Sequence, residues 1–561
     1  MMALRNPFIL LSTWSVCFAL LVKAGFIDKD TPEDFHSVVS FEDQRVYELV
    51  FSDEFNEDGR LFYDGYDPKW TVVHKDDYTN AALQFYHKDN VQTSDGFLNI
   101  TSDRVDTTFQ AFSDKNGSWY PLTKNYRSGM VQGWNKFCFT GGIVEISAEL
   151  PGDADIGGLW PAMWILGNLA RATFTGTSDN VWPWSYDECD PKRIRQQAFS
   201  ACNNYNHWGF KKHQGRGAPE IDILEVMPGK EDLPKTTTKK PYLSSSFQVS
   251  PGLDNIYRPK VGSYPVEGYW YGPGGFLYGE NSTLNIFFYG ETLISRKSSD
   301  QNYLADALSA NTNIGETHFH KQHTYRLEWI PGRGGYLRWY LDNYLVYGIN
   351  QNALVNGGII PEEPSYLIFN TAISSMWGFP APCPDTCGCD CWDCKDADCL
   401  CAIPKNMCQN LPAHFLIDYV RVYQAPDDEK QWVGCNSEDF PMMRYVEHNR
   451  HLFTEKGSHQ PLLPIAKGGA KCDGDYDCGY GNCTSSGKCS CLPGFVGPDC
   501  LAQDAFFDET YDEWACEWAV YGPQIWQGEF STIMIAAGIV LLVLIVVRIT
   551  ETKKTRRYTA S

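Results

Sequence analysis

Three acidic residues stand close together in the stretch GAPEIDILEV, residues 217–226. Glu220, Asp222 and Glu225 are interleaved with large aliphatic residues, a pattern typical of a buried β-strand. Side chains alternate along a strand, so Glu220 and Asp222 share one face. A regular strand would turn Glu225 to the other face, because it lies three positions after Asp222. We predict a β-bulge between them, which absorbs the extra position and brings all three carboxylates to one face.

Carboxylates in such a row can break a glycosidic bond. Retaining glycosidases hold two carboxyl groups about 5–5.5 Å apart, one as the nucleophile and the other as the general acid and base. The general acid needs a raised pKa, which burial and a neighbouring carboxylate supply. The middle acid can hydrogen-bond the nucleophile and orient it. From the spacing alone, calcium binding and a solvated acidic face are the alternatives.

Aromatic residues before this strand are candidates for contacts with a sugar, because pyranose rings stack on indole faces. Trp160 and Trp164 lie four positions apart in GLWPAMWILGN, residues 158–168, so on a strand they share a face. Trp184, Tyr186 and Arg127 are further candidates for substrate binding. Ordinary core packing is the alternative for the aromatic residues, and surface salt bridging is the alternative for Arg127.

The elements that must position these residues read as strands joined by turns from residue 45 to residue 425. GGIVEISAEL (141–150) and FLIDYVRVYQ (415–424) both alternate apolar and polar residues. We find no long stretch with a helical period in this range. The sequence therefore predicts an all-β fold, an antiparallel two-sheet sandwich with long loops.

Two apolar segments flank this domain. Residues 1–24 have the charged start and apolar centre of a secretory signal peptide, with an uncleaved anchor as the alternative. Residues 530–548 are apolar and long enough for a transmembrane helix, and a basic tail at 549–561 predicts a cytosolic C-terminus. We expect a single-pass type I membrane protein of the secretory pathway or plasma membrane, with its large domain lumenal or extracellular. A buried core helix is the alternative for the second segment.

Charge and cysteine content support that setting. The 561 residues carry a net charge of −22, which argues against a nucleic-acid partner. Of the 20 cysteines, only Cys17 lies in the predicted signal peptide. Eight cysteines at 383–408 predict a disulfide-stapled insertion, with a metal cluster as the alternative. Four sequons between the apolar segments predict N-glycosylation, at Asn99, Asn116, Asn281 and Asn482.

A second cysteine cluster, at 471–501, resembles an EGF-like module, through its C-x-C pair and its ending GFVGPDC. The resemblance implies a rigid stalk or a contact with another protein. It also implies three disulfides, Cys472 with Cys483, Cys478 with Cys489, and Cys491 with Cys500. Residues 426–470 are expected to form a connecting segment, and residues 502–529 a juxtamembrane segment.

The motif E-I-D-I-L-E resembles the signature of glycoside hydrolase family 16, a β-jelly-roll family that acts on β-glucans and galactans. GLWPAMWILGN, HTYRLEWIPG, WYLDN and IDYVRVYQ resemble other strands of that family, in the expected order. A narrower group fits better, since YRSGMVQGWNKFCFTGG, DNVWPWSYDECD and GRGAPEIDILEV resemble fungal β-1,6-glucan synthesis-associated proteins of the SKN/KRE type. By this resemblance Glu220 is the nucleophile, Asp222 orients it, and Glu225 is the acid and base.

The resemblance implies a membrane-anchored retaining β-glucan hydrolase or transglycosylase that takes part in synthesis or remodelling of cell-wall β-1,6- or β-1,3-glucan. Its partners would be a β-glucan polysaccharide or oligosaccharide and the membrane. The alternative is a non-catalytic glucan-binding scaffold of the glucan-synthesis machinery. The reaction requires no cofactor and no catalytic metal, and a structural calcium ion on the sandwich is left open.

Overall fold

The computed structural model covers the whole chain and describes 26–63, 67, 69–113, 116–185, 188–189, 210, 213–230, 238–260, 262–264, 271–272, 274–287, 290, 292–294, 302–380, 384–385, 387–388, 391–453, 468–469, 472–478, 481–493, 495–496, 500 and 502–503. The predicted signal peptide, transmembrane helix and cytosolic tail lie outside these residues. Among the described residues we find no helix with the length and apolar character needed to cross a bilayer.

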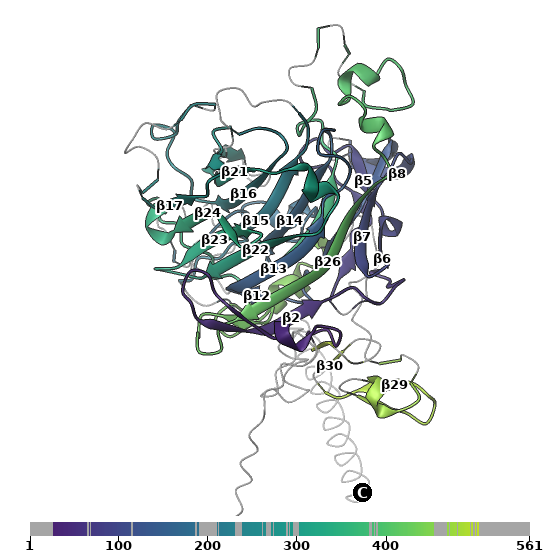
Figure 1. Ribbon diagram of the computed structural model, residues 1–561, viewed down its shortest axis with the longest axis vertical. Coiled ribbons are helices and arrows are strands. Elements are labelled where there is room, and N and C mark those ends of the chain that lie inside the picture. Colours follow the sequence, from purple (N-terminus) through teal and green to yellow (C-terminus); the bar gives the residue numbers. More distant parts are fainter. Residues whose placement is uncertain are drawn as a thin grey trace, which may run out of the picture.

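Two ten-stranded sheets form a sandwich (Figure 1). The first sheet has the order β1 (Ser37–Val39), β2 (Val46–Asp53), β26 (Ala413–Gln424), β13 (Gly142–Glu149), β22 (His323–Ile330), β23 (Tyr336–Leu341), β24 (Tyr344–Asn350) and β17 (Phe276–Tyr278), with β6 (Val91–Ser94) and β7 (Phe97–Ser102) joined to β26. The second has the order β18 (Ser282–Leu284), β21 (Asp306–Asn313), β16 (Tyr242–Val249), β15 (Glu220–Met227), β14 (Trp160–Gly167), β25 (Ser365–Ala372), β11 (Met130–Gln132) and β3 (Thr71–Val72), with β12 (Phe139–Thr140) and β27 (Trp432–Val433) beside β25.

Short elements decorate the sandwich. A three-stranded sheet at one end contains β4 (Lys75–Asp76), β5 (Gln84–Tyr86) and β10 (Tyr126–Ser128). Two-stranded ladders pair β8 (Thr107–Ser113) with β9 (Ser118–Lys124), β19 (Thr292–Ile294) with β20 (Asn302–Leu304), β28 (Gly481–Cys483) with β29 (Cys489–Cys491), and β30 (Phe495–Val496) with β31 (Ala502–Gln503). The described helices are α1 (Thr175–Ser178) and α2 (Met443–His448), with single 3₁₀ turns at Glu33–Phe35, Lys88–Asn90, Glu316–Phe319, Gln351–Ala353, Leu400–Ala402, Met407–Gln409, Arg450–Leu452 and Asp475–Cys478.

The main core lies between the two large sheets. Alternate residues of β13, among them Val144 and Ile146, meet apolar residues of β15 and β25, such as Ile221 and Phe369, in one cluster of buried side chains. All strand pairs within these two sheets are antiparallel. The predicted antiparallel sandwich is confirmed.

The domain extends beyond both of its predicted boundaries. Phe26 belongs to the main core, although it precedes residue 45. On the other side, Cys435 forms a disulfide with Cys138, and Tyr445 and Phe453 are buried in a second cluster that covers the outer face of the β14–β25 sheet. Much of the expected connecting segment is therefore part of the sandwich domain.

The cysteine-rich insertion is cross-linked internally by disulfides, and the side chain of Tyr126 in β10 contacts it. The described pairs are Cys387–Cys401, Cys391–Cys399 and Cys394–Cys408. Tyr126 donates its hydroxyl proton to the carbonyl oxygen of Trp392, at 2.6 Å. These observations support the disulfide interpretation over a metal cluster for the described cysteines of this loop.

The following module contains the three disulfides that its resemblance implied, Cys472–Cys483, Cys478–Cys489 and Cys491–Cys500. Its assignment as EGF-like stays a prediction. Of the sequon asparagines, Asn116, Asn281 and Asn482 are exposed, and Asn99 on β7 is half-buried. Their glycosylation also stays a prediction.

Candidate active site

The acid strand β15 carries the predicted bulge. On one side, Trp164 pairs with Asp222 but Met163 already pairs with Leu224, so Ile223 has no partner of its own in β14. The register also shifts against β16 between Asp222 and Glu225. Ile223 and Leu224, the two residues of the bulge, are buried in the main core. The prediction from the three-residue gap is confirmed.

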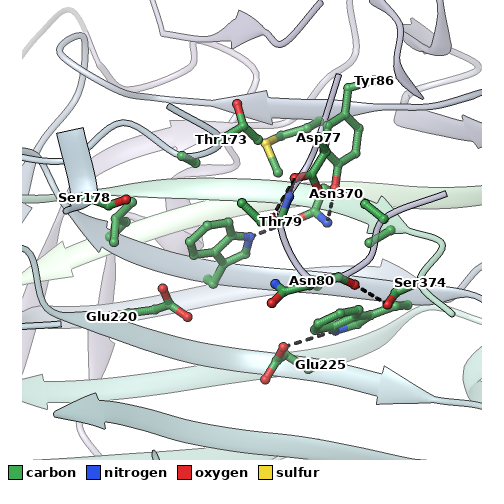
Figure 2. Close-up of a pocket in the computed structure, with 18 of the residues that line it drawn as sticks. Asp77, Thr79, Asn80, Tyr86, Thr173, Ser178, Glu220, Glu225, Asn370 and Ser374 are labelled. Atoms are coloured by element: carbon green, nitrogen blue, oxygen red, sulfur yellow. Dashed lines mark hydrogen bonds between the residues drawn. The ribbon is translucent and has the colours of Figure 1, made fainter. Parts of the chain in front are cut away.

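A cavity of about 280 Å³ lies over the bulged strand, and all three acids line it. Its floor comes from β14, β15 and β25, and its walls come from the loops at 77–82 and 171–182. Figure 2 shows Glu220 and Glu225 reaching into this space from the strand, with Asp77, Tyr86 and Asn370 gathered on another side. The cavity is therefore a pocket with carboxylates on its floor and loop residues around it.

Asp222 is the most deeply buried of the three acids, with 2% of its surface exposed. The hydroxyl of Ser246 and the amide of Gln248 both donate hydrogen bonds to its Oδ2, the second at 3.2 Å. The side chains of Asp222 and Glu220 are also hydrogen-bonded to each other. Trp339 in the facing sheet donates its indole proton to the backbone carbonyl of Asp222, at 2.9 Å. Asp222 is therefore fixed from the neighbouring strand, from the facing sheet and by Glu220.

Each glutamate accepts a hydrogen bond from an indole. Trp182 Nε1 lies 2.7 Å from Glu220 Oε2, and Trp160 Nε1 lies 3.1 Å from Glu225 Oε1. Trp160 is itself held by Trp377, whose ring stacks on it with centroids 4.4 Å apart and an angle of 10°. An indole is a donor only, so both contacts orient a carboxyl oxygen without taking a proton from it.

Burial raises the pKa of all three carboxyl groups. For Asp222 the pKa rises to about 6, because burial outweighs the hydrogen bonds from Ser246, Gln248 and Glu220. The pKa values of Glu220 and Glu225 lie well above the usual range, and the negative charge of Asp222 adds to the effect of burial in both cases. The cluster therefore favours a partly protonated state near neutral pH, as a general acid requires.

Some of the predicted substrate-binding residues line the cavity and others do not. Trp160 and Trp164 both line the cavity. Trp184 does not line it, because its side chain is 1% exposed and packs against Ile359, so its assignment to substrate binding is wrong. Arg127 does not line the cavity and donates from Nε to Thr107 Oγ1 at 2.6 Å, and its role in substrate binding stays a prediction. Tyr186 lies outside the described residues.

Several cavity residues were missed from the sequence, namely Asp77, Asn80, Thr173 and Asn370. Two of them have backbone conformations that L-residues rarely adopt, with φ of 50° at Asn80 and 70° at Thr173. Asparagine tolerates a positive φ, but a β-branched threonine there is an outlier. Such strain is found where the surrounding structure enforces a particular side-chain position. The sequence carries no periodic signal for these loops.

A β-sandwich with three crowded carboxyl groups at the base of a pocket has the groups that glycosidic chemistry requires. The family profile described as "Beta-glucan synthesis-associated protein SKN1/KRE6/Sbg1" matches residues 9–382. The chain belongs to this family, which confirms the resemblance seen in its motifs.

Curated relatives agree with this assignment. The chain is 31% identical over 472 residues to the β-glucan synthesis-associated protein KRE6 of Candida albicans, covering 79% of this chain and 54% of the relative. It is 31% identical over 461 residues to SKN1 of Saccharomyces cerevisiae, covering 77% of this chain and 50% of the relative. The chain thus spans about half the length of these relatives. Among solved structures, the catalytic domain of an endo-1,3-β-glucanase from Thermotoga petrophila is 18% identical with a TM-score of 0.35, covering 68% of this chain and 99% of that one.

Proposed function

We propose that this chain is a membrane-anchored, retaining β-glucan hydrolase or transglycosylase that acts in the synthesis or remodelling of cell-wall β-glucan. The observation that carries the proposal is the row of three acids on one face of the bulged strand β15, at the floor of the cavity. The relatives are known as β-glucan synthesis-associated proteins, which supports β-glucan as the substrate class.

In this proposal Glu220 attacks the anomeric carbon of a β-linked glucosyl unit. The bond from that carbon to the glycosidic oxygen breaks, and Glu225 gives its proton to the leaving oxygen. A covalent glycosyl–enzyme results. Water or a sugar hydroxyl then attacks the same carbon, Glu225 takes the proton of the attacking group, and Glu220 leaves as a carboxylate. Two inversions give net retention.

Attack requires Glu220 without its proton, although burial favours the protonated form. The hydrogen bond between Glu220 and Asp222 offers a way to meet both conditions, because one proton between the two carboxyls can rest on Asp222. The indole of Trp182 stabilises the ionised form of Glu220. Asp222, ionised before the reaction, is then the partner that takes the proton of Glu220 when Glu220 acts as nucleophile.

Two features of the proposal come from the sequence alone. The segments at 1–24 and 530–548 support a type I membrane protein whose large domain lies in the secretory lumen or outside the cell. The EGF-like resemblance supports a protein contact near the membrane. Transfer to a second glucan chain suits a role in wall assembly better than hydrolysis does, because it rearranges chains without shortening the total polymer.

The test uses the full-length protein purified in detergent, beside Glu220→Gln and the control Glu316→Gln, whose side chain is 81% exposed. Each sample is incubated with defined β-1,3- and β-1,6-linked gluco-oligosaccharides, and products are identified by mass spectrometry. Wild type and Glu316→Gln should give the same products, shorter for hydrolysis and longer for transfer, and Glu220→Gln should give none. Equal product formation by Glu220→Gln would refute the assignment. Binding of the oligosaccharides without any product from wild type would favour the scaffold function.

A further inference from the structure

A chain of hydrogen bonds leads from the cavity tryptophan Trp164 to Tyr86, which lies beside a buried carboxylate on another side of the pocket. Trp164 Nε1 donates to Asn370 Oδ1 at 2.8 Å. Asn370 Nδ2 lies 3.2 Å from the hydroxyl oxygen of Tyr86. Burial raises the pKa of the Tyr86 hydroxyl, and the negative charge of the neighbouring Asp77 carboxylate raises it further. Figure 2 shows Tyr86, Asn370 and Asp77 together, away from Glu220 and Glu225.

The direction of this chain is fixed by its first member. An indole nitrogen can only donate, so the oxygen of the Asn370 amide must face Trp164 and its nitrogen must face Tyr86. The hydroxyl oxygen of Tyr86 accepts that bond, which leaves its own proton for Asp77. Both hydrogen bonds therefore donate toward Tyr86, and the negative charge of Asp77 beside it favours the orientation in which the hydroxyl proton points at that carboxylate.

Asp77 is held in place by donors of its own. The backbone N–H and the hydroxyl of Thr79 donate to its Oδ1, at 3.0 and 2.6 Å. Gln84 Nε2 donates to its Oδ2 at 3.3 Å, and the orientation of this amide is set because Gln84 Oε1 accepts from the backbone N–H of Ile373 at 2.9 Å. Asp77 is 6% exposed, and Tyr86 is 1% exposed. The described donors converge on one buried carboxylate that the proposed reaction does not use.

We propose that Asp77 is a positioning residue that acts on the sugar through Tyr86, Asn370 and Trp164. The chain holds the Trp164 indole at one orientation in the cavity, where its ring can stack on a pyranose ring of the substrate. Breaking the chain frees the amide of Asn370 to turn and the indole to adopt other orientations. The loss should therefore appear in sugar binding, while Glu220, Asp222 and Glu225 keep their own hydrogen-bond partners.

Three variants of the full-length protein test the inference. Asp77→Asn replaces the carboxylate beside Tyr86, Tyr86→Phe breaks the chain and keeps the Asp77 carboxylate, and the double variant does both. Tyr78→Phe is the control, because it removes the same hydroxyl group from a tyrosine next to Asp77 that is 57% exposed and does not line the cavity.

The first measurement needs no sugar. Protein labelled with 5-fluorotryptophan is studied by ¹⁹F NMR, and the resonance of Trp164 is assigned by its loss in Trp164→Phe. This resonance should shift or broaden in Asp77→Asn and in Tyr86→Phe, and should stay in place in Tyr78→Phe. An unchanged Trp164 resonance in Tyr86→Phe would overturn the inference, whatever the protein does to glucans.

The second measurement rests on the proposed function. With laminaritriose and gentiotriose as probes, KM or Kd should rise about fivefold in either single variant, which corresponds to the loss of one hydrogen bond. The value of kcat should stay within about twofold of wild type. The double variant should be no worse than the single variants, because both break one chain. If the rises in KM or Kd of the two single variants multiply in the double variant, Asp77 acts independently of Tyr86. Weaker binding in Asp77→Asn with normal binding in Tyr86→Phe would show the same. If wild type binds neither sugar, the result counts against the proposed function. The NMR measurement would still test whether Tyr86 and Asp77 hold Trp164 in place.

Discussion

Replacing Asp222 with asparagine should make the protein more stable at neutral pH. Burial raises the pKa of Asp222 from 3.8 to about 6. One pKa unit corresponds to about 1.36 kcal/mol, so the ionised carboxylate costs the folded state about 3 kcal/mol at neutral pH. Asparagine has no proton to lose, and its oxygen can still accept from Ser246 and Gln248. The substitution therefore removes the cost and keeps the hydrogen bonds.

The sign of this effect depends on pH. Between about pH 4 and pH 6 the folded protein holds a proton on Asp222 that the unfolded chain releases, so the wild type loses stability as pH rises through this window. Below that window the carboxyl is protonated in both states, and asparagine gives no advantage. The gain should be present at pH 7.5 and nearly absent at pH 4.0.

Asp53→Asn is the matched control with the opposite expectation. Asp53 is fully buried and bonded to the guanidinium of Arg60 by contacts of 2.6 and 2.9 Å. Arg60 and Lys69 hold the pKa of Asp53 well below its usual range against the effect of burial. The same change of one oxygen to an amide removes one of the two buried carboxylates that pair with Arg60, the other being Asp67, so it should cost about 1–3 kcal/mol at pH 7.5.

The assay is urea unfolding of the oxidised full-length protein in detergent, followed by tryptophan fluorescence at pH 7.5 and pH 4.0. Asp222→Asn should raise the midpoint at pH 7.5, and Asp53→Asn should lower it. An equal shift of the Asp222→Asn midpoint at both pH values would show that packing causes the change. A lower midpoint at pH 7.5 would refute the reasoning.

Three further predictions concern the cavity. Glu225→Gln should lower turnover of natural oligosaccharides by about 10²–10⁴-fold with little change in binding, and added azide should yield a glycosyl azide from a substrate with a good leaving group, detected by mass spectrometry. Ser246→Ala removes a donor that lowers the pKa of Asp222, so the acidic limb of the pH–rate profile should move to higher pH. Thr173→Val should leave the urea midpoint unchanged or higher, because the buried Thr173 hydroxyl has no hydrogen-bond partner among the described residues.

The strands and the acid row could be predicted because both follow from local periodicity. A two-residue repeat marks β13 and β26, and the departure from it between Asp222 and Glu225 marks the bulge. The two-sheet architecture follows once many such strands are found without helical segments. These features depend on neighbours in the sequence, which a single chain displays directly.

The walls of the cavity could not be predicted, because they depend on contacts between distant segments. Asp77 precedes Asn370 by almost the whole length of the domain, and only the folded sheet brings them together through Tyr86. The tryptophans show the same limit. Trp182 contacts Glu220 while Trp184 is buried two positions later, and nothing in the sequence WPW indicates which indole faces the pocket.

Buried carboxylates in this domain are stabilised in two ways. One is found at carboxylates with a structural role and the other at the carboxyl groups of the cavity. Asp53 and Glu54 are paired with the guanidinium groups of Arg60 and Arg421, and the positive charge of Arg60 favours the ionised form of Asp53. Glu220 and Glu225 accept instead from the neutral indoles of Trp182 and Trp160. A guanidinium beside Glu225 would fix its position and also hold the carboxyl ionised, which a general acid cannot accept. The neutral indole of Trp160 fixes Glu225 and leaves its proton available for transfer, so the use of tryptophan beside this glutamate is itself an argument for acid–base chemistry at this site.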